Sequence, residues 1–142
     1  MRESSLWDWL RARLPQAGHY SRIESETSPG FPDIHYSLGG VTGTIELKDS
    51  KRPKATCPFG RSTGLRVSQL LWIADELASG GLVFICAGIG PTVYFLPGDL
   101  YDSFNQLILT DFLGYSLLTL DRKKSDPLIA SQELRKLLMN KR

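Results

Sequence analysis

The sequence predicts an α/β fold, with a mixed central β-sheet flanked by helices in a single domain. Segments with helical periodicity alternate with short apolar strands. Their order is helix, three strands, helix, two strands, and then a C-terminal part with weaker patterning. The length of 142 residues suits one domain with its own core. No internal repeat or low-complexity tract indicates a second domain.

The first half of the chain is predicted to contain one helix and three strands. Apolar residues recur at helical spacing from about residue 3 to residue 14, where Pro15 follows. A loop rich in Ser, Thr, Pro and Gly is expected over residues 25–31. The last two strands are joined through Leu38-Gly39-Gly40, which indicates a hairpin. The three strands are expected over residues 19–23, 33–37 and 41–47.

The second half is predicted to contain a helix, two strands and a further helix. The first of these helices runs from about residue 66 to residue 78 and ends before Gly80-Gly81. Beyond Pro97 the pattern is ambiguous until Ser125-Asp126-Pro127, which is typical of a helix start. The strands are expected over residues 82–87 and 92–96. The apolar face of the first helix is expected to comprise Val67, Leu70, Leu71, Ala74 and Leu77.

The net charge of +2 conceals a segregation of charge along the chain. Residues 48–66 contain six basic residues and one acid, and residues 122–142 contain seven basic residues and two acids. Residues 67–121 contain six acids and no lysine or arginine. This segregation favours a basic face that binds a polyanion, with simple clustering of solvated charge as the alternative.

The cysteines and the hydropathy give no sign of an oxidising compartment or a membrane. Cys57 and Cys86 form no CxxC pair and no zinc-ligand pattern, and Cys86 lies in an apolar strand where a buried thiol is expected. No apolar run approaches the roughly 20 residues that a membrane span requires. A cytoplasmic protein without a membrane partner is therefore expected. The sequence has no GxGxxG, P-loop or Ser/His/Asp pattern, so no organic cofactor is expected.

Three residues suited to phosphodiester hydrolysis are predicted to meet at one edge of the sheet. Side chains alternate along a strand, so Ile45 and Leu47 should point into the core. Glu46 and Lys48 then share the other face. Asp33 begins the preceding strand of the same hairpin, and it should therefore lie near the Glu46–Lys48 end.

Two carboxylates and a lysine suit this chemistry for a physical reason. Carboxylate oxygens hold Mg²⁺ while the ion keeps most of its waters. The metal neutralises the phosphate and lowers the pKa of its water, and the lysine can orient or deprotonate that water. The alternative is an ordinary cross-strand ion pair beside an Asp in a turn. The Gly30-Phe31-Pro32-Asp33 string and the basic loop that follows Lys48 favour the catalytic interpretation.

These motifs resemble the core of the PD-(D/E)xK nuclease superfamily, which implies a restriction-endonuclease-like core. The matching strings are Gly-x-Pro-Asp, ending at Asp33, and Ile45-Glu46-Leu47-Lys48. More narrowly, the chain is similar to the VRR-NUC (virus-type replication-repair nuclease) group and to phage Holliday-junction-resolvase-like nucleases. The narrower resemblance rests on Arg22-Ile23-Glu24, Leu65-Arg66-Val67-Ser68-Gln69, Trp72 and Gly80-Gly81. It covers about residues 3–96, with residues 97–142 as an extension that completes the domain.

The resemblance implies a role for each matched site residue. Asp33 and Glu46 would bind Mg²⁺ or Mn²⁺, helped by the backbone carbonyl of Leu47. Lys48 would be the catalytic lysine. Gln69 would contact the site or the substrate from the second helix.

A further carboxylate is expected to complete the metal site, and two candidates remain open. Glu3 lies in the first helix, from which related nucleases supply such a group. Glu24 lies shortly before Asp33 and belongs to the Arg-Ile-Glu string. The long basic segment after Lys48 is expected to grip the nucleic acid. The predicted nucleic-acid-binding residues are Lys51, Arg52, Lys54, Arg61 and Arg66.

The residues therefore predict a metal-dependent nuclease. The resemblance further implies a DNA endonuclease that selects branched DNA, flaps or Holliday junctions, in phage-type replication, recombination or repair. The resemblance implies a homodimer, located in the host cytoplasm if the chain is phage-encoded. Two alternatives remain. One is a non-catalytic nucleic-acid-binding module on the same fold, and the other is a sequence-specific restriction-type nuclease.

Overall fold

The computed structural model describes residues 2–23, 30–60 and 63–140, with side chains described from Ser5 onward in the first helix. Its strands are β1 (His19–Arg22), β2 (Ile34–Leu38), β3 (Val41–Asp49), β4 (Val83–Ile89), β5 (Thr92–Pro97) and β6 (Leu118–Asp121). Its α-helices are α1 (Arg2–Arg11), α2 (Val67–Ala78), α3 (Leu109–Tyr115) and α4 (Pro127–Met139). Two short 3-10 helices, η1 (Gly98–Asp102) and η2 (Phe104–Gln106), lie between β5 and α3.

The described strands form one six-stranded sheet in the order of the sequence, β1 to β6. Every neighbouring pair is antiparallel except β3 and β4, which run parallel. A parallel pair needs a crossover connection, and α2 supplies it. The prediction of an α/β fold with a mixed sheet flanked by helices is therefore confirmed.

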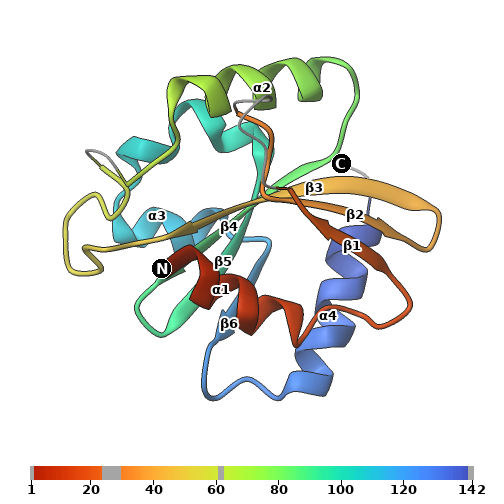
Figure 1. Cartoon of the computed structure of the whole chain (residues 1–142). Helices are drawn as coiled ribbons and strands as arrows, with labels where there is room; N and C mark the ends of the chain where they lie inside the picture. The colour runs from red at the N-terminus through yellow and green to blue at the C-terminus, as the bar shows by residue number, and fades with distance from the viewer. Residues whose placement is uncertain (1, 24–29, 61–62, 141–142) are drawn as a thin grey trace.

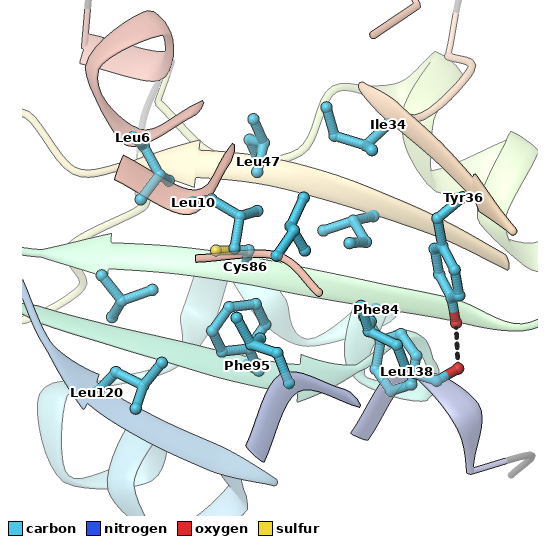
Figure 2. Packing of buried hydrophobic residues seen from close by; sticks show 14 of the residues in the cluster. Leu6, Leu10, Ile34, Tyr36, Leu47, Phe84, Cys86, Phe95, Leu120 and Leu138 are labelled. Carbon is cyan, nitrogen blue, oxygen red and sulfur yellow. Dashed lines mark hydrogen bonds between the residues drawn. The ribbon is translucent and has the colours of Figure 1, made fainter. Parts of the chain in front are cut away.

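Helices cover both faces of the sheet, so the molecule has two cores (Figure 1). α1 and α4 pack on one face, where Ile45 and Leu47 of β3 and Phe84 of β4 are fully buried. Figure 2 shows this packing, including the hydrogen bond of 2.8 Å from the Tyr36 hydroxyl to the Leu138 carbonyl of α4. The other face is covered by α2, η1, η2 and α3. The site described below lies on that α2 side.

Alternation along β3 follows the predicted pattern, but two helix predictions are wrong in detail. The first helix ends at Arg11 instead of residue 14. The chain turns there, with the amides of Arg13 and Leu14 both donating to the Leu10 carbonyl, and Leu14 still reaches the core.

The second correction concerns the buried face of α2. Val67 and Leu71 were expected on its apolar face, yet they are 70% and 62% exposed. The helix instead buries Gln69 and Ile73. Gln69 can be buried because its amide finds a hydrogen-bond partner on β3.

The C-terminal part, ambiguous in sequence, contributes an edge strand and a helix to the same sheet. β6 pairs with β5, and α4 packs on the face that also carries α1. α4 begins as predicted: Asp126 caps it by accepting a hydrogen bond from the Leu128 amide at 2.8 Å, with Pro127 in the first turn. No helix in the described ranges is long and apolar enough to cross a bilayer.

Candidate active site

Two charged side chains of β3 lie side by side beneath α2. Glu46 and Lys48 alternate with the core residues, so both face the α2 side of the sheet. The Lys48 ammonium lies 3.6 Å from Oε2 of Glu46. Their side chains are only 6% and 2% exposed, respectively. Removing either partner of a buried ion pair of this kind would leave an uncompensated charge in the protein interior, which is strongly destabilising.

Asp33 joins this pair from the neighbouring strand. The β2–β3 register pairs Ile34 with Ile45, so Asp33 lies one residue beyond that ladder, level with Glu46. Oδ2 of Asp33 accepts a hydrogen bond of 2.8 Å from the backbone N–H of Leu47. The side chain thus takes the place of a backbone acceptor where the β2–β3 ladder stops. The hairpin geometry predicted from the sequence brings Asp33, Glu46 and Lys48 together.

The turn before Asp33 packs against the start of α2. Gly30 has a φ of +88° and lies against the Ser68 carbonyl, where a Cβ atom would be 2.1 Å from the oxygen. The Phe31 ring packs on Trp72 of α2, with 4.8 Å between the ring centroids. The contacts of Gly30 and Phe31 therefore hold the turn against α2, and this turn directs the Asp33 side chain toward β3.

Gln69 connects α2 to the carboxylate of β3. Its Nε2 donates to Oε2 of Glu46 at 2.8 Å, and its Oε1 accepts from the Arg66 amide at 2.9 Å. The second bond fixes the orientation of the side-chain amide, with the oxygen toward the start of α2 and the nitrogen toward Glu46. Oε2 of Glu46 thus lies near both an amide donor and the Lys48 ammonium.

The backbone of Leu47 presents a further oxygen to this region. The amides of Thr44 and Ser50 donate to carbonyls at the β4 side, at 2.9 and 2.8 Å. In a strand the N–H and C=O groups of one residue point to the same side, and successive residues alternate. Leu47 therefore directs its carbonyl to the β2 side, toward which its N–H already donates to Asp33.

The donors gathered here fit a hard divalent cation. They are two carboxylates, from Asp33 and Glu46, and the Leu47 carbonyl. Mg²⁺ is commonly bound by one or two carboxylates while it keeps several waters. Within residues 2–23, 30–60 and 63–140, no group of three or more His, Cys, Asp or Glu side chains gathers to hold a metal.

Three predicted residues fall wholly or partly outside what the structure describes. Glu24 and Arg61 lie outside the described residues. Glu3 lies in the first turn of α1, but its side chain is outside the described part. The choice between Glu3 and Glu24 as the further carboxylate thus stays open.

The predicted nucleic-acid-binding residues differ in their surroundings. Lys51, Lys54 and Arg66 are exposed. Arg52 is half-buried, and its guanidinium donates to the Cys57 carbonyl at 3.0 Å, inside the loop itself. We therefore expect Arg52 to shape the loop, and Lys51 and Lys54 to be available to a ligand.

The basic loop after β3 is folded against the α2-side core. Phe59 is fully buried, with its ring 4.8 Å from Phe104 and 5.7 Å from Phe112, centroid to centroid. Ser50 is buried at the start of the loop, and its hydroxyl donates to the Pro58 carbonyl at 2.9 Å. These contacts hold the loop beside the end of β3 that carries Lys48.

Sequence reasoning missed two residues that support the site from a distance. Asn105 makes two hydrogen bonds to the Leu65 backbone, at 2.8 and 3.0 Å, just before α2. Arg122 forms an ion pair with Asp49, the last residue of β3. Each residue lies dozens of positions from its partner, so no local pattern in the sequence marks it.

A polar hollow adjoins the site on the same face of the sheet. It has a volume of about 260 Å³ and lies between α2 and the β2–β3 hairpin. His35 and Thr44 line it, and each lies two residues along its strand from Asp33 or Glu46. The sheet face that carries Asp33, Glu46 and Lys48 therefore continues into this hollow.

No family model and no curated protein matches the sequence. Among solved structures, the chain is similar to that of Hjc, a Holliday junction resolvase from the hyperthermophilic archaeon Archaeoglobus fulgidus, with a TM-score of 0.46 and 15% sequence identity. The similarity covers 70% of this chain and 76% of that chain. At this TM-score and identity, the similarity assigns neither a family nor an activity to the chain.

Proposed function

We propose that the chain is a divalent-metal-dependent DNA endonuclease of the PD-(D/E)xK type. One observation carries the proposal. Asp33 accepts a hydrogen bond from the Leu47 amide and lies opposite Glu46 on the neighbouring strand. Lys48 lies beside Glu46 on the same face of the sheet. This is the set of groups that metal-assisted phosphodiester hydrolysis requires, assembled from two strands of one hairpin.

Each residue has a distinct part in the proposed reaction. Asp33, Glu46 and the Leu47 carbonyl would hold Mg²⁺ or Mn²⁺, and the ion would supply positive charge at the phosphate and lower the pKa of a bound water. Lys48 orients that water or stabilises the charge developing on the phosphate. Gln69 holds Glu46 in place from α2, through its bond of 2.8 Å to Oε2.

The proposed substrate is branched DNA, such as a flap or a Holliday junction, in phage-type replication, recombination or repair. This part rests on the sequence resemblance to phage-encoded nucleases, whose compact members often act as homodimers. Exposed Lys51 and Lys54 flank the site and would bind phosphates without reading the sequence.

Cleavage of a substrate panel tests the proposed function. Purified protein is incubated with labelled linear duplex, flap, splayed and four-way DNA, and with an RNA duplex, in the presence of Mg²⁺, Mn²⁺ or EDTA. We expect metal-dependent cuts in a branched DNA. Tight binding without cleavage of any substrate would favour a non-catalytic binding module. Cleavage of linear duplex at a fixed sequence would favour a restriction-type nuclease.

The further carboxylate can be identified from metal dependence. A residue near the metal, when changed to Gln, should raise the Mg²⁺ concentration that gives half-maximal cleavage. We expect this shift for Glu3→Gln, because the start of a helix favours a negative charge near the sheet edge. Glu24→Gln should leave the metal curve unchanged. The opposite pattern would transfer the role to Glu24.

The salt dependence of DNA binding tests the basic loop. Changing Lys51 and Lys54 together to Gln should weaken binding and reduce the slope of log K against log salt by about 1.8, since each duplex phosphate contact contributes about 0.9. Arg52→Gln alone should chiefly lower thermal stability, because its guanidinium donates to Cys57. A matched control changes the exposed Lys123 and Lys124, beyond β6, to Gln. If that pair lowers the slope as much, the phosphate contacts extend over the basic C-terminal segment and are not confined to this loop.

A further inference from the structure

Asp49 ends β3 directly after Lys48 and carries a buried ion pair with the C-terminal part of the chain. Its Oδ1 accepts from Nη2 of Arg122 at 2.6 Å, and its Oδ2 lies 3.4 Å from Nη1. The Asp49 side chain is 2% exposed and that of Arg122 is 21% exposed. This bidentate contact between the guanidinium and the carboxylate fixes both the position and the orientation of the Asp49 side chain.

The neighbouring strand is shaped to let this ion pair form. Gly88 of β4 pairs with Asp49 in the parallel ladder. A Cβ atom on Gly88 would lie 2.2 Å from Nη2 of Arg122 and 2.7 Å from Oδ1 of Asp49. The guanidinium thus crosses β4 at a residue without a side chain, and any larger residue there would displace it.

Arg122 is itself held by two other parts of the fold. Its amide donates to the Pro91 carbonyl in the β4–β5 turn at 2.7 Å. Its carbonyl accepts from the Trp9 indole of α1 at 3.0 Å. The turn after β6 is closed around Arg122, because Oδ1 of Asp121 accepts a hydrogen bond from the amide of Lys123 at 2.9 Å. The guanidinium therefore extends toward β3 from a fixed backbone.

The C-terminal end of β3, the strand that carries Glu46 and Lys48, has fewer strand neighbours than the rest of β3. The β2–β3 ladder runs only from Leu38–Val41 to Ile34–Ile45, whereas the β3–β4 ladder continues to Asp49–Gly88. Beyond Leu47, β3 is thus held by ladder pairing along one edge only, within the described residues. The Asp49–Arg122 pair acts at that end, one residue from Lys48.

We propose that Arg122 is a positioning residue for catalysis. Through Asp49 it fixes the end of β3, and so the direction in which Lys48 presents its ammonium beside Glu46. This inference rests on the proposed nuclease function and assigns a role to the C-terminal part of the chain. Arg122 touches neither substrate nor metal in this role and acts only through the backbone of β3.

The test compares Arg122→Lys with Tyr36→Phe. Arg122→Lys keeps the positive charge but cannot make the bidentate contact with Asp49. Tyr36→Phe removes another buried contact between the C-terminal part and the sheet. This contact is the 2.8 Å hydrogen bond from the Tyr36 hydroxyl to the Leu138 carbonyl, away from the site. For Arg122→Lys we expect kcat to fall on the order of 10–100-fold, the scale for misplacing a catalytic group, with KM for DNA unchanged. Tyr36→Phe should lower the melting temperature but keep the wild-type kcat.

A second variant and a second measurement separate positioning from stability. Gly88→Ala should lower kcat as Arg122→Lys does, because the added methyl group occupies the space of the guanidinium. Hydrogen exchange of the backbone amides of Lys48 and Ser50, which point to the β4 side, should become faster in both variants, and not in Tyr36→Phe. This exchange is measured without metal or DNA, so it reports on the strand even if wild-type protein cleaves nothing and the proposed function fails.

Three results would overturn the proposal. One is a kcat within about twofold of wild type in Arg122→Lys and Gly88→Ala, a change of only about 0.4 kcal/mol in the activation free energy. Another is unchanged amide exchange at the end of β3 in both variants. The third is a loss of kcat in Tyr36→Phe as large as in Arg122→Lys, which would show that general stability and not the position of β3 sets the rate.

Discussion

Asp33→Asn, Glu46→Gln and Lys48→Ala are each expected to lower the rate of DNA cleavage by at least about 10²–10³-fold, the scale seen when one group that stabilises developing charge is removed. Under the proposed function, either amide removes a carboxylate assigned to the metal, and the alanine removes the ammonium assigned to the attacking water or the phosphate. DNA binding should persist, because the exposed lysines of the loop are unchanged. The measurement is single-turnover cleavage at saturating metal, with binding followed by fluorescence anisotropy.

Stability must be separated from chemistry in these variants, because Glu46 and Lys48 are buried beside each other. Circular dichroism and thermal melting establish that each variant is folded at the assay temperature. The matched control is Glu133→Gln, which removes one partner of an exposed ion pair with Lys136 at 3.2 Å. It should cleave at the wild-type rate. Near-wild-type turnover by any of the three site variants would contradict the assignment of that residue.

Gly30→Ala is expected to damage both the fold and the site. A positive φ costs a residue with a Cβ atom roughly 1–2 kcal/mol, and the new atom would also meet the Ser68 carbonyl of α2. Relieving that contact should cost a further 1–3 kcal/mol, roughly the cost of overpacking. Since the same turn aims Asp33 at β3, cleavage should fall even at temperatures where the variant is folded.

Gly40→Ala is the matched control for this prediction. Gly40 has a φ of +82°, close to that of Gly30, but no atom lies within 4 Å of a Cβ built there. It should therefore show the backbone strain alone, as a modest drop in melting temperature with unchanged cleavage. Equal losses of stability and activity in Gly30→Ala and Gly40→Ala would show that packing against α2 does not position Asp33.

Much of the sheet could be predicted because its pattern is local. The alternation of apolar and polar residues along β3 gave the two faces of the strand, and the Gly39-Gly40 turn gave the hairpin register. Asp33, Glu46 and Lys48 belong to that single hairpin, so their meeting followed from strand geometry. The helix start at Asp126-Pro127 was equally local and is confirmed.

Other features depend on contacts that a sequence does not display. Val67 and Leu71 look like the buried face of α2, but the helix turns Gln69 inward because Glu46 offers it a hydrogen bond. The Asp49–Arg122 pair joins residues 73 positions apart. Short, ambiguous apolar segments such as those of η2 and α3 take their form from packing around Phe59, which itself lies in a loop.

The most direct measurement of the central claim is metal binding by the protein without DNA. Mn²⁺ is titrated into metal-free wild type, Asp33→Asn, Glu46→Gln and Glu133→Gln, with calorimetry and thermal melting as readouts. A cation bound only to the folded protein stabilises it by about 2.7 kcal/mol at a concentration 100 times its Kd. We predict one saturable site and a raised melting temperature in wild type and Glu133→Gln, and the loss of both in Asp33→Asn and Glu46→Gln. Equal Mn²⁺ binding by all four proteins would contradict the claim that Asp33 and Glu46 form the metal site.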